Sequence, residues 1–102
     1  MKYFLIKYHF TNGSKDEWHR DVASFIAALD SDPVLGGKIS YRAMKTEADD
    51  YYHLAAVVDS EVVKVLGSRE FFERYTQTTE QVGGGHVDVL PLEMVAETAF
   101  KA

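Results

Sequence analysis

The densest group of residues that could do chemistry lies near the C-terminus of this 102-residue chain, where Gly83, Gly84 and Gly85 run into His86 and Asp88. A glycine loop that cradles a phosphate needs a strand before it and a helix N-terminus after it, because the free N–H groups of the helix hold the anion. Here the hydropathy pattern predicts a helix before the glycines and a strand after them. The glycine run therefore indicates a helix end and a turn, since glycine tolerates positive φ there.

Histidine is the other residue type that could do chemistry, as a metal ligand or as a base. His86 and Asp88 are two apart on the predicted last strand and so share a face. With a strand order of 4-1-3-2, His9, His53 and His86 are expected near one end of the sheet, on the face turned away from the helices. Metal sites use three or four ligands, and histidines at strand ends are more often exposed or paired with a carboxylate. No metal site is predicted.

Hydrophobic periodicity defines the elements that must position these residues. Residues 2–10 alternate with a period of two and predict a strand. Ser14 and Glu17 form a capping box that begins a helix, and Pro33 ends it. The apolar stripe of this helix consists of Trp18, Val22, Phe25, Ile26 and Leu29.

The middle of the chain predicts a hairpin followed by a broken helix. Two strands are expected over about 36–46 and over 51–58, joined by a short acidic turn. Residues 59–82 have a helical pattern that Gly67 interrupts, and Ser68 is placed to cap a new start. We therefore expect a short helix, a kink and a longer helix.

The last strand is expected from His86 to about Ala96, with Pro91 requiring an edge position or a bulge. The resulting order, β-α-β-β-α-β, is that of a ferredoxin-like α+β domain. In its usual arrangement the strand order is 4-1-3-2 and both helices cover one face of an antiparallel sheet. A single domain over residues 1–102 is predicted.

Both faces of the predicted sheet are apolar, although the helices cover only one. The helix side is expected to hold Phe4, Ile6, Tyr8, Tyr52, Leu54, Val87 and Val89. The opposite side is expected to hold Leu5, Ala55, Val57 and Leu90. An uncovered apolar face predicts a homodimer that forms through the sheet.

The composition excludes several classes of protein. The net charge is -5 with 16 acidic and 11 basic residues and no basic run, which argues against a nucleic-acid partner. The absence of cysteine excludes disulfides, thiolate metal sites and cysteine catalysis. The N-terminus does not resemble a signal peptide, and no apolar run approaches the roughly 20 residues of a membrane helix. A cytoplasmic protein with no membrane partner is predicted.

Two segments resemble the dimeric α/β-barrel superfamily, and most of all its antibiotic-biosynthesis-monooxygenase branch. "DPVLGGKISYRAMK", residues 32–45, is similar to that branch's acidic turn, glycine and strand. "EVVKVLGSREFFERY", residues 61–75, is similar to its short helix, serine and phenylalanine, here Leu66, Ser68 and Phe71. The resemblance implies a ferredoxin-like domain that dimerises into an α/β barrel. The superfamily includes cofactor-independent oxygenases of aromatic polyketides, isomerases and haem proteins.

The resemblance does not extend to a haem site. In the family pattern, histidines often precede the leucine of the short helix and the phenylalanine of the long one. This chain has Val65 and Glu70 at those places. Haem-degrading relatives use a histidine from this region, so no cofactor is expected.

A pocket between the helices and the sheet is the predicted site for a small apolar or aromatic ligand. Its walls are expected to be Tyr8, Trp18, Phe25, Tyr52, Phe72 and Tyr75, with His19 or His53 at its mouth. An aromatic stripe at helical spacing is more often core than pocket. The tyrosines favour a pocket, because each buried hydroxyl needs a partner or a cavity.

The resemblance implies a cofactor-free reaction in which the substrate, as a carbanion or phenolate, supplies the electrons. Such a site needs a base and an orienting hydrogen bond. His53 is the predicted base, and Tyr75 or Trp18 the predicted orienting group. Tyr41 and Arg42 are expected either to contact the substrate or to pair across the sheet edge. The alternative is a non-catalytic binding or stress-associated barrel with a filled core and histidines that face water.

Overall fold

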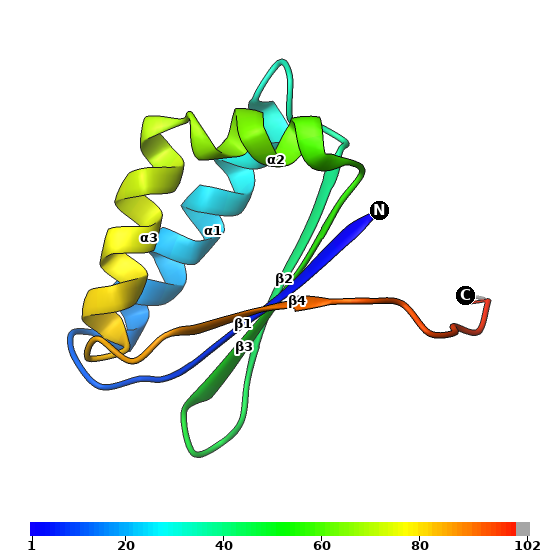
Figure 1. Ribbon diagram of the computed structural model, residues 1–102. Coiled ribbons are helices and arrows are strands. Elements are labelled where there is room, and N and C mark those ends of the chain that lie inside the picture. Colours follow the sequence, from blue (N-terminus) through cyan, green and yellow to red (C-terminus); the bar gives the residue numbers. More distant parts are fainter. Residues whose placement is uncertain (100–102) are drawn as a thin grey trace.

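The computed structural model describes residues 1–99 of the predicted domain, and its helices lie on one side of a four-stranded sheet (Figure 1). No helix of residues 1–99 covers the other side of the sheet. No helix of the described range is long and apolar enough to cross a membrane. The elements in chain order are β1 (Lys2–His9), α1 (Lys15–Ser31), β2 (Ile39–Lys45), β3 (Asp50–Val57), α2 (Ser60–Gly67), α3 (Glu70–Val82) and β4 (Asp88–Leu92).

The sheet has the strand order β2-β3-β1-β4 with every neighbouring pair antiparallel, which confirms the ferredoxin-like α+β prediction. β4 is an edge strand, as Pro91 requires, because an edge position does not need the missing N–H. The predicted break in the second helical segment is also confirmed. α2 ends at Gly67 and α3 begins at Glu70.

α1 begins and ends at polar caps that the sequence supplies. The Ser14 side chain accepts a hydrogen bond from the Glu17 N–H at 3.3 Å. At the other end, the Asp32 carboxylate accepts from the backbone N–H groups of Val34 and Leu35 at 2.9 and 3.0 Å. Arg69 also donates to Asp32 at 2.9 Å and holds the pKa of that carboxyl below its usual range. The pair joins the end of α1 to the start of α3.

The glycine run forms a helix end and a turn, as predicted. The Gly83 N–H donates to the Thr79 carbonyl at 2.9 Å and closes the last turn of α3. Gly84 and Gly85 then adopt positive φ values of 63° and 81°, which glycine reaches without strain. The chain is thereby reversed into β4.

The predicted bounds of two strands and one predicted helix cap were wrong. β2 begins at Ile39 rather than near residue 36, since the preceding residues form a turn. β4 spans only Asp88–Leu92, because the His86 N–H donates back to the Gly83 carbonyl and pairing with β1 ends at Leu92. Ser68 does not cap α3: its hydroxyl donates to the Val65 carbonyl at 2.6 Å and closes α2 instead.

The prediction for the faces of β3 was also wrong. Cross-strand partners share a face, and Ile6 on the helix side is paired with His53. Tyr52 and Leu54 therefore lie on the free side, and Tyr52 is 39% exposed. The residues of β3 that face the helices are Tyr51, His53, Ala55 and Val57, all buried. Leu5 and Leu90 are cross-strand partners on the free side, as predicted.

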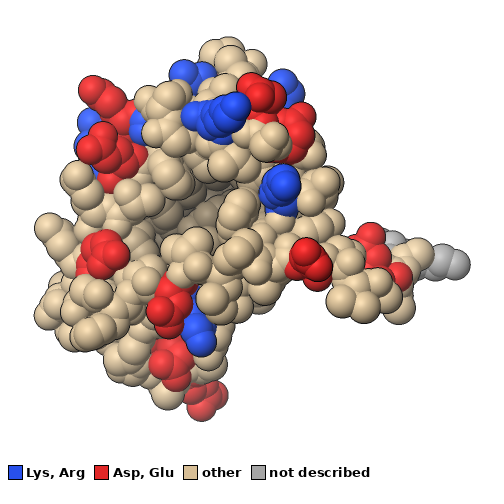
Figure 2. Space-filling model, in the orientation of Figure 1, with Lys and Arg blue, Asp and Glu red and all other residues tan. Residues whose placement is uncertain are grey.

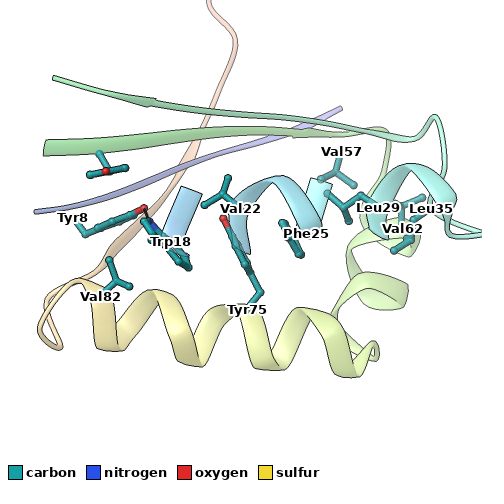
Figure 3. Close-up of a cluster of buried hydrophobic side chains, with 11 residues drawn as sticks. Tyr8, Trp18, Val22, Phe25, Leu29, Leu35, Val57, Val62, Tyr75 and Val82 are labelled. Atoms are coloured by element: carbon teal, nitrogen blue, oxygen red, sulfur yellow. Dashed lines mark hydrogen bonds between the residues drawn. The ribbon is translucent and has the colours of Figure 1, made fainter. Parts of the chain in front are cut away.

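The core lies between the helices and the sheet (Figure 3). Trp18, Val22, Phe25 and Leu29 of α1 are buried, so four of the five residues of the predicted stripe form its helical side. Tyr75, Thr79 and Val82 bury the matching face of α3. α1 and α3 pack against one another as well as over the sheet (Figure 1).

Gly36 and Gly67 form a matched pair for testing the turn that follows α1. A Cβ atom at Gly36 would lie 2.8 Å from the Asp30 carbonyl oxygen and 3.0 Å from that of Asp32. Because backbone atoms cannot move aside cheaply, we expect Gly36→Ala to lower the free energy of unfolding by about 1–3 kcal/mol. Urea denaturation measures the change.

Gly67→Ala is the control, since a Cβ atom there meets nothing within 4 Å. Alanine is favoured over glycine in a helix, so this variant is expected to gain about 0.5–1 kcal/mol. Equal effects of the two substitutions would contradict the packing described for Gly36.

Candidate functional site

The centre of the candidate site is His53, whose side chain is fully buried between β3 and the helices at 0% exposure. Its Nε2 atom lies 2.8 Å from the Tyr8 hydroxyl. Its Nδ1 atom lies 2.6 Å from the Tyr41 hydroxyl and 3.3 Å from that of Tyr75. Both ring nitrogens are therefore paired, each with a phenol.

The tyrosines are held by further contacts. The Trp18 indole N–H donates to the Tyr8 hydroxyl at 2.8 Å (Figure 3), and the Tyr41 and Tyr75 hydroxyls are 3.0 Å apart. The Tyr75 ring stacks on Phe25 with a centroid distance of 3.8 Å and on Trp18 at 5.5 Å. We call the connected series Trp18, Tyr8, His53, Tyr41 and Tyr75 the hydroxyl chain. No buried side-chain N or O atom in the described part of the protein lacks a hydrogen-bond partner.

Burial sets the protonation states in the hydroxyl chain. It lowers the pKa of His53 to about 4, so the imidazole is neutral near neutral pH. It raises the pKa of Tyr41 to about 12, and it raises the pKa values of Tyr8 and Tyr75 as well. Each phenol therefore keeps its proton.

A cavity of about 340 Å³ lies beside this chain, between the sheet and the helices α2 and α3. Figure 2 shows it as a hollow, with most of the charged side chains at the periphery of this face. Its size is near the lower end of the roughly 300–1,000 Å³ typical of small-molecule pockets. The apolar wall includes Phe4, Ile6, Leu29, Ile39, Ala55, Val63, Leu66 and Val89.

Few polar side chains reach the cavity. Tyr41 and Tyr75 form part of its wall and bring the end of the hydroxyl chain to it. The hydroxyls of Thr76 and Thr79 are also in the wall, but they donate to backbone carbonyls of α3. Glu80 is the charged residue among the described lining residues. An apolar ligand with one polar group suits such a lining.

The predicted site residues fall into three groups. Phe25, Phe72 and Tyr75 line the cavity. Tyr8 and Trp18 lie behind it, buried in the hydroxyl chain, and His53 lies there too rather than at the mouth.

Tyr52 and His19 lie away from the cavity. Tyr52 is on the free face of the sheet, because its neighbour His53 takes the inner face of β3. His19 is exposed on α1 and contacts the Tyr51 hydroxyl through Nε2 at 2.7 Å. The structure therefore does not place Tyr52 in the wall of this cavity or His19 at its mouth.

The predicted convergence of three histidines was wrong as well. His53 faces the helices, whereas His9 lies exposed at the end of β1 with its Nδ1 atom 3.0 Å from Asp50. No group of three or more potential metal ligands occurs among the described residues. His9 matches the expected pairing of a strand-end histidine with a carboxylate.

Glu80 and Thr76 were not predicted from the sequence as site residues, and Tyr41 was predicted only as one of two residues that contact the substrate or pair across the sheet edge. Thr76 and Glu80 are four residues apart and so share one face of α3. That spacing could have identified them, because Phe72, four residues before Thr76, was already expected in the pocket wall. For Tyr41 the sequence indicated only an inward position on a strand. Such a position does not predict contact with a histidine.

His53 makes the stability depend on pH. The folded state holds its pKa at about 4, against 6.5 for an ordinary histidine, so protons bind the unfolded chain preferentially in this window. The free energy of unfolding is expected to fall by about 3 kcal/mol as the pH drops from 6.5 to 4. Urea denaturation across this range measures the slope.

His53→Gln removes the ionisable group and is the comparison variant. It is expected to be less stable at neutral pH and to have a flatter profile between pH 4 and 6.5. The lowered pKa values of Asp32 and Asp49 affect stability mainly near and below their ordinary value of 3.8, and they do so in both proteins, so they do not account for a difference between the two slopes. An unchanged slope in the variant would contradict the buried, neutral state of His53.

Solved structures of other proteins share this architecture. The structure of an antibiotic biosynthesis monooxygenase matches with a TM-score of 0.75 at 10% identity, over 94% of this chain and 100% of the other. SnoaB, a cofactor-independent oxygenase from Streptomyces nogalater, matches with a TM-score of 0.73 at 10% identity, over 94% and 95%. A protein of unknown function from Nitrosomonas europaea matches with a TM-score of 0.71 at 9% identity, over 99% and 95%.

Sequence comparisons add no relative: no family model matches the chain, and no curated protein does. Similarity at this level of identity establishes the fold and leaves the chemistry to the site. The chain has the ferredoxin-like α+β fold of the antibiotic-biosynthesis-monooxygenase structures.

Proposed function

We propose that this chain is a small-molecule-binding α/β-barrel protein that acts as a cofactor-independent, monooxygenase-like enzyme on an aromatic or polyketide-like compound. The observation that carries the proposal is the apolar cavity of about 340 Å³ with Tyr41 and Tyr75, whose hydroxyls are paired with each other, among its lining residues. Apolar walls suit a fused-ring compound, and a few polar groups fix its orientation. SnoaB, which shares the fold, is a cofactor-independent oxygenase.

In this proposal Tyr75 is the group that contacts the substrate. Its hydroxyl binds a substrate oxygen and stabilises the negative charge that develops there when the substrate loses a proton. The resulting carbanion reduces O₂, so that one oxygen atom enters the substrate and the other leaves as water. Tyr75 is well placed for this role because stacking on Phe25 and contact with Tyr41 fix its ring.

His53 has a different role from the one that the sequence predicts. It reaches the cavity only through the tyrosines, and a pKa of about 4 makes it a weak proton acceptor near neutral pH. We therefore assign it, with Trp18 behind Tyr8, to positioning the hydroxyl that binds the substrate. Glu80, a carboxylate in the cavity wall, is the candidate for the base.

A non-catalytic binding or stress-associated barrel is the alternative function. The filled core and water-facing histidines expected for it do not match the cavity and the buried His53. In its remaining form the alternative is a protein that binds a ligand in this cavity without turnover. The expected cytoplasmic location is a prediction common to both.

Anthrone is a suitable probe, since it is a fused-ring ketone with an acidic CH₂ group, and oxidation by one O₂ gives anthraquinone and water. We expect the protein to accelerate this reaction over the buffer alone. Ala55→Phe, which fills the cavity from its β3 floor, is expected to reduce the rate at least about tenfold by blocking the site. Oxygen uptake and anthraquinone absorbance measure the rate.

Ala27→Phe is the matched control, because Ala27 is exposed on α1 away from the cavity. It is expected to retain the full rate. Binding of anthrone without turnover would favour the non-catalytic alternative, and equal rates in both variants would place the reaction outside this cavity.

We also propose a homodimer that forms through the free sheet face. This face is not covered by the described helices, and it carries Leu5, Leu54, Leu90 and Leu92 from three adjacent strands. The charged residues Lys7, Arg42 and Asp88 share the same side of the sheet. Uncovered apolar faces of this kind are typical of interfaces.

Leu90→Asp places a charge on this face at a residue that is 41% exposed, so the fold should tolerate it. Native mass spectrometry is expected to give a dimer for the unaltered chain and a monomer for the variant, because burial of an unpaired carboxylate is costly. Ala27→Asp on the outer face of α1 should remain dimeric. A monomeric unaltered chain would refute the dimer.

A further inference from the structure

Building on the proposed function, we infer that the hydroxyl chain runs in one direction, from Trp18 to Tyr75, and ends in a hydrogen-bond donor at the cavity. The cavity therefore selects flat apolar ligands that present a hydrogen-bond acceptor, such as a ring carbonyl. Ligands of the same shape that present only an N–H or O–H donor are disfavoured.

The direction is set at Trp18. An indole nitrogen carries a proton to donate and has no lone pair with which to accept. It donates to the Tyr8 oxygen at 2.8 Å. The Tyr8 hydroxyl must then donate its own proton to another group. Among the described residues, the other group within reach of the Tyr8 hydroxyl is Nε2 of His53, at 2.8 Å. Nε2 therefore accepts, because an unpaired buried donor is the costlier arrangement.

The His53 imidazole sets the direction of the next hydrogen bond, because it accepts at one nitrogen and donates at the other. A neutral histidine has a proton on only one ring nitrogen, and burial keeps the pKa of His53 near 4. With Nε2 as the acceptor, the proton is on Nδ1. The Nδ1–H group donates to the Tyr41 oxygen at 2.6 Å and points partly to that of Tyr75 at 3.3 Å.

The last step brings a donor to the cavity wall. The Tyr41 and Tyr75 hydroxyls are 3.0 Å apart and either could donate to the other. Because the Tyr41 oxygen already accepts from Nδ1, we assign the donated proton to Tyr41; the reverse assignment would leave the free proton on Tyr41, which also lines the cavity. The proton of Tyr75 then has no acceptor within the described residues. Tyr75 forms part of the cavity wall, where a ligand oxygen or a water molecule can accept that proton.

The opposite direction fails at Tyr8. If Nε2 carried the proton, the Tyr8 oxygen would accept from both His53 and Trp18, and its own proton would have no acceptor. Tyr8 is 5% exposed and does not line the cavity, so a ligand could not supply the missing acceptor. A buried Tyr8 hydroxyl without an acceptor would be costly, whereas a free Tyr75 hydroxyl at the cavity can donate to a ligand.

The first experiment determines the tautomer of His53 in the ligand-free protein. Long-range ¹⁵N–¹H correlation spectra of uniformly ¹⁵N-labelled protein near pH 7 distinguish the protonated ring nitrogen, and the spectrum of His53→Gln assigns the signals. We expect the proton on Nδ1. A proton on Nε2, or an even mixture of the two tautomers, would overturn the inference.

The second experiment uses three tricyclic probes of nearly the same shape. Fluorenone presents a carbonyl acceptor, carbazole presents an N–H donor, and fluorene presents neither. Equilibrium dialysis is expected to show fluorenone bound roughly tenfold more tightly than fluorene, with no gain for carbazole. Preference for carbazole would overturn the inference, because it requires an acceptor at the end of the chain.

Tyr75→Phe tests where the preference arises, since it keeps the stacked ring and removes the hydroxyl. The affinity for fluorenone should fall toward that for fluorene, which should itself stay unchanged. Tyr52→Phe, on the free face of the sheet, is the control and should keep the preference. Equal binding of all three probes to the unaltered protein would leave the cavity as a ligand site and refute the direction of the chain. Failure of all three probes to bind would refute the cavity itself and, with it, the proposed function.

Discussion

Burial of the His53 imidazole between the sheet and the helices is the constraint on which the rest of the structure depends. Moving an unpaired polar group out of water costs about 2–7 kcal/mol, so both ring nitrogens need partners. Those partners are tyrosines from three separate elements, at distances of 2.6 to 3.3 Å. Each hydroxyl can meet the ring only if β1, β2 and α3 occupy their observed places relative to β3. The polar centre therefore fixes the relative positions of the surrounding elements, which apolar contacts alone would leave free to slide.

The same constraint explains which features could be predicted from the sequence. The alternation of β1 and the stripe of α1 are clear because one side of each is more uniformly apolar than the other. β3 offers no such contrast. One side carries Tyr51, His53, Ala55 and Val57, and the other carries Tyr52, Leu54, Ala56 and Val58. Hydropathy favours Leu54 over His53 as the inner residue, and the hydrogen bonds of His53 reverse that preference. Those partners come from distant positions in the chain, where local patterns carry no information about them.

The cavity follows from the way in which the aromatic side chains are held. Large rings in a small domain usually fill the available space by choosing their rotamers. Here the Tyr75 ring is stacked on Phe25, with a centroid distance of 3.8 Å, and its hydroxyl is bound to Tyr41. It cannot rotate toward the space between α3 and β1 without losing both contacts. Ala55, which lies opposite on β3, is too small to fill that space from below. The hydrogen bonds that close the polar centre thus leave the apolar cavity open beside it.

Because the side chains of β3 alternate between the two faces of the sheet, this strand contributes both to the cavity and to the free face. His53 and Ala55 face the helices and contribute to the polar centre and the cavity floor, whereas Tyr52 and Leu54 face the free side. Because neighbouring residues point in opposite directions, a substitution on one face leaves the packing of the other nearly untouched. The cavity and the free face of the sheet are therefore physically independent, although they are separated by the thickness of a single sheet. A ligand could influence assembly only by displacing the β3 backbone, and the hydrogen bonds of both neighbouring strands resist that displacement.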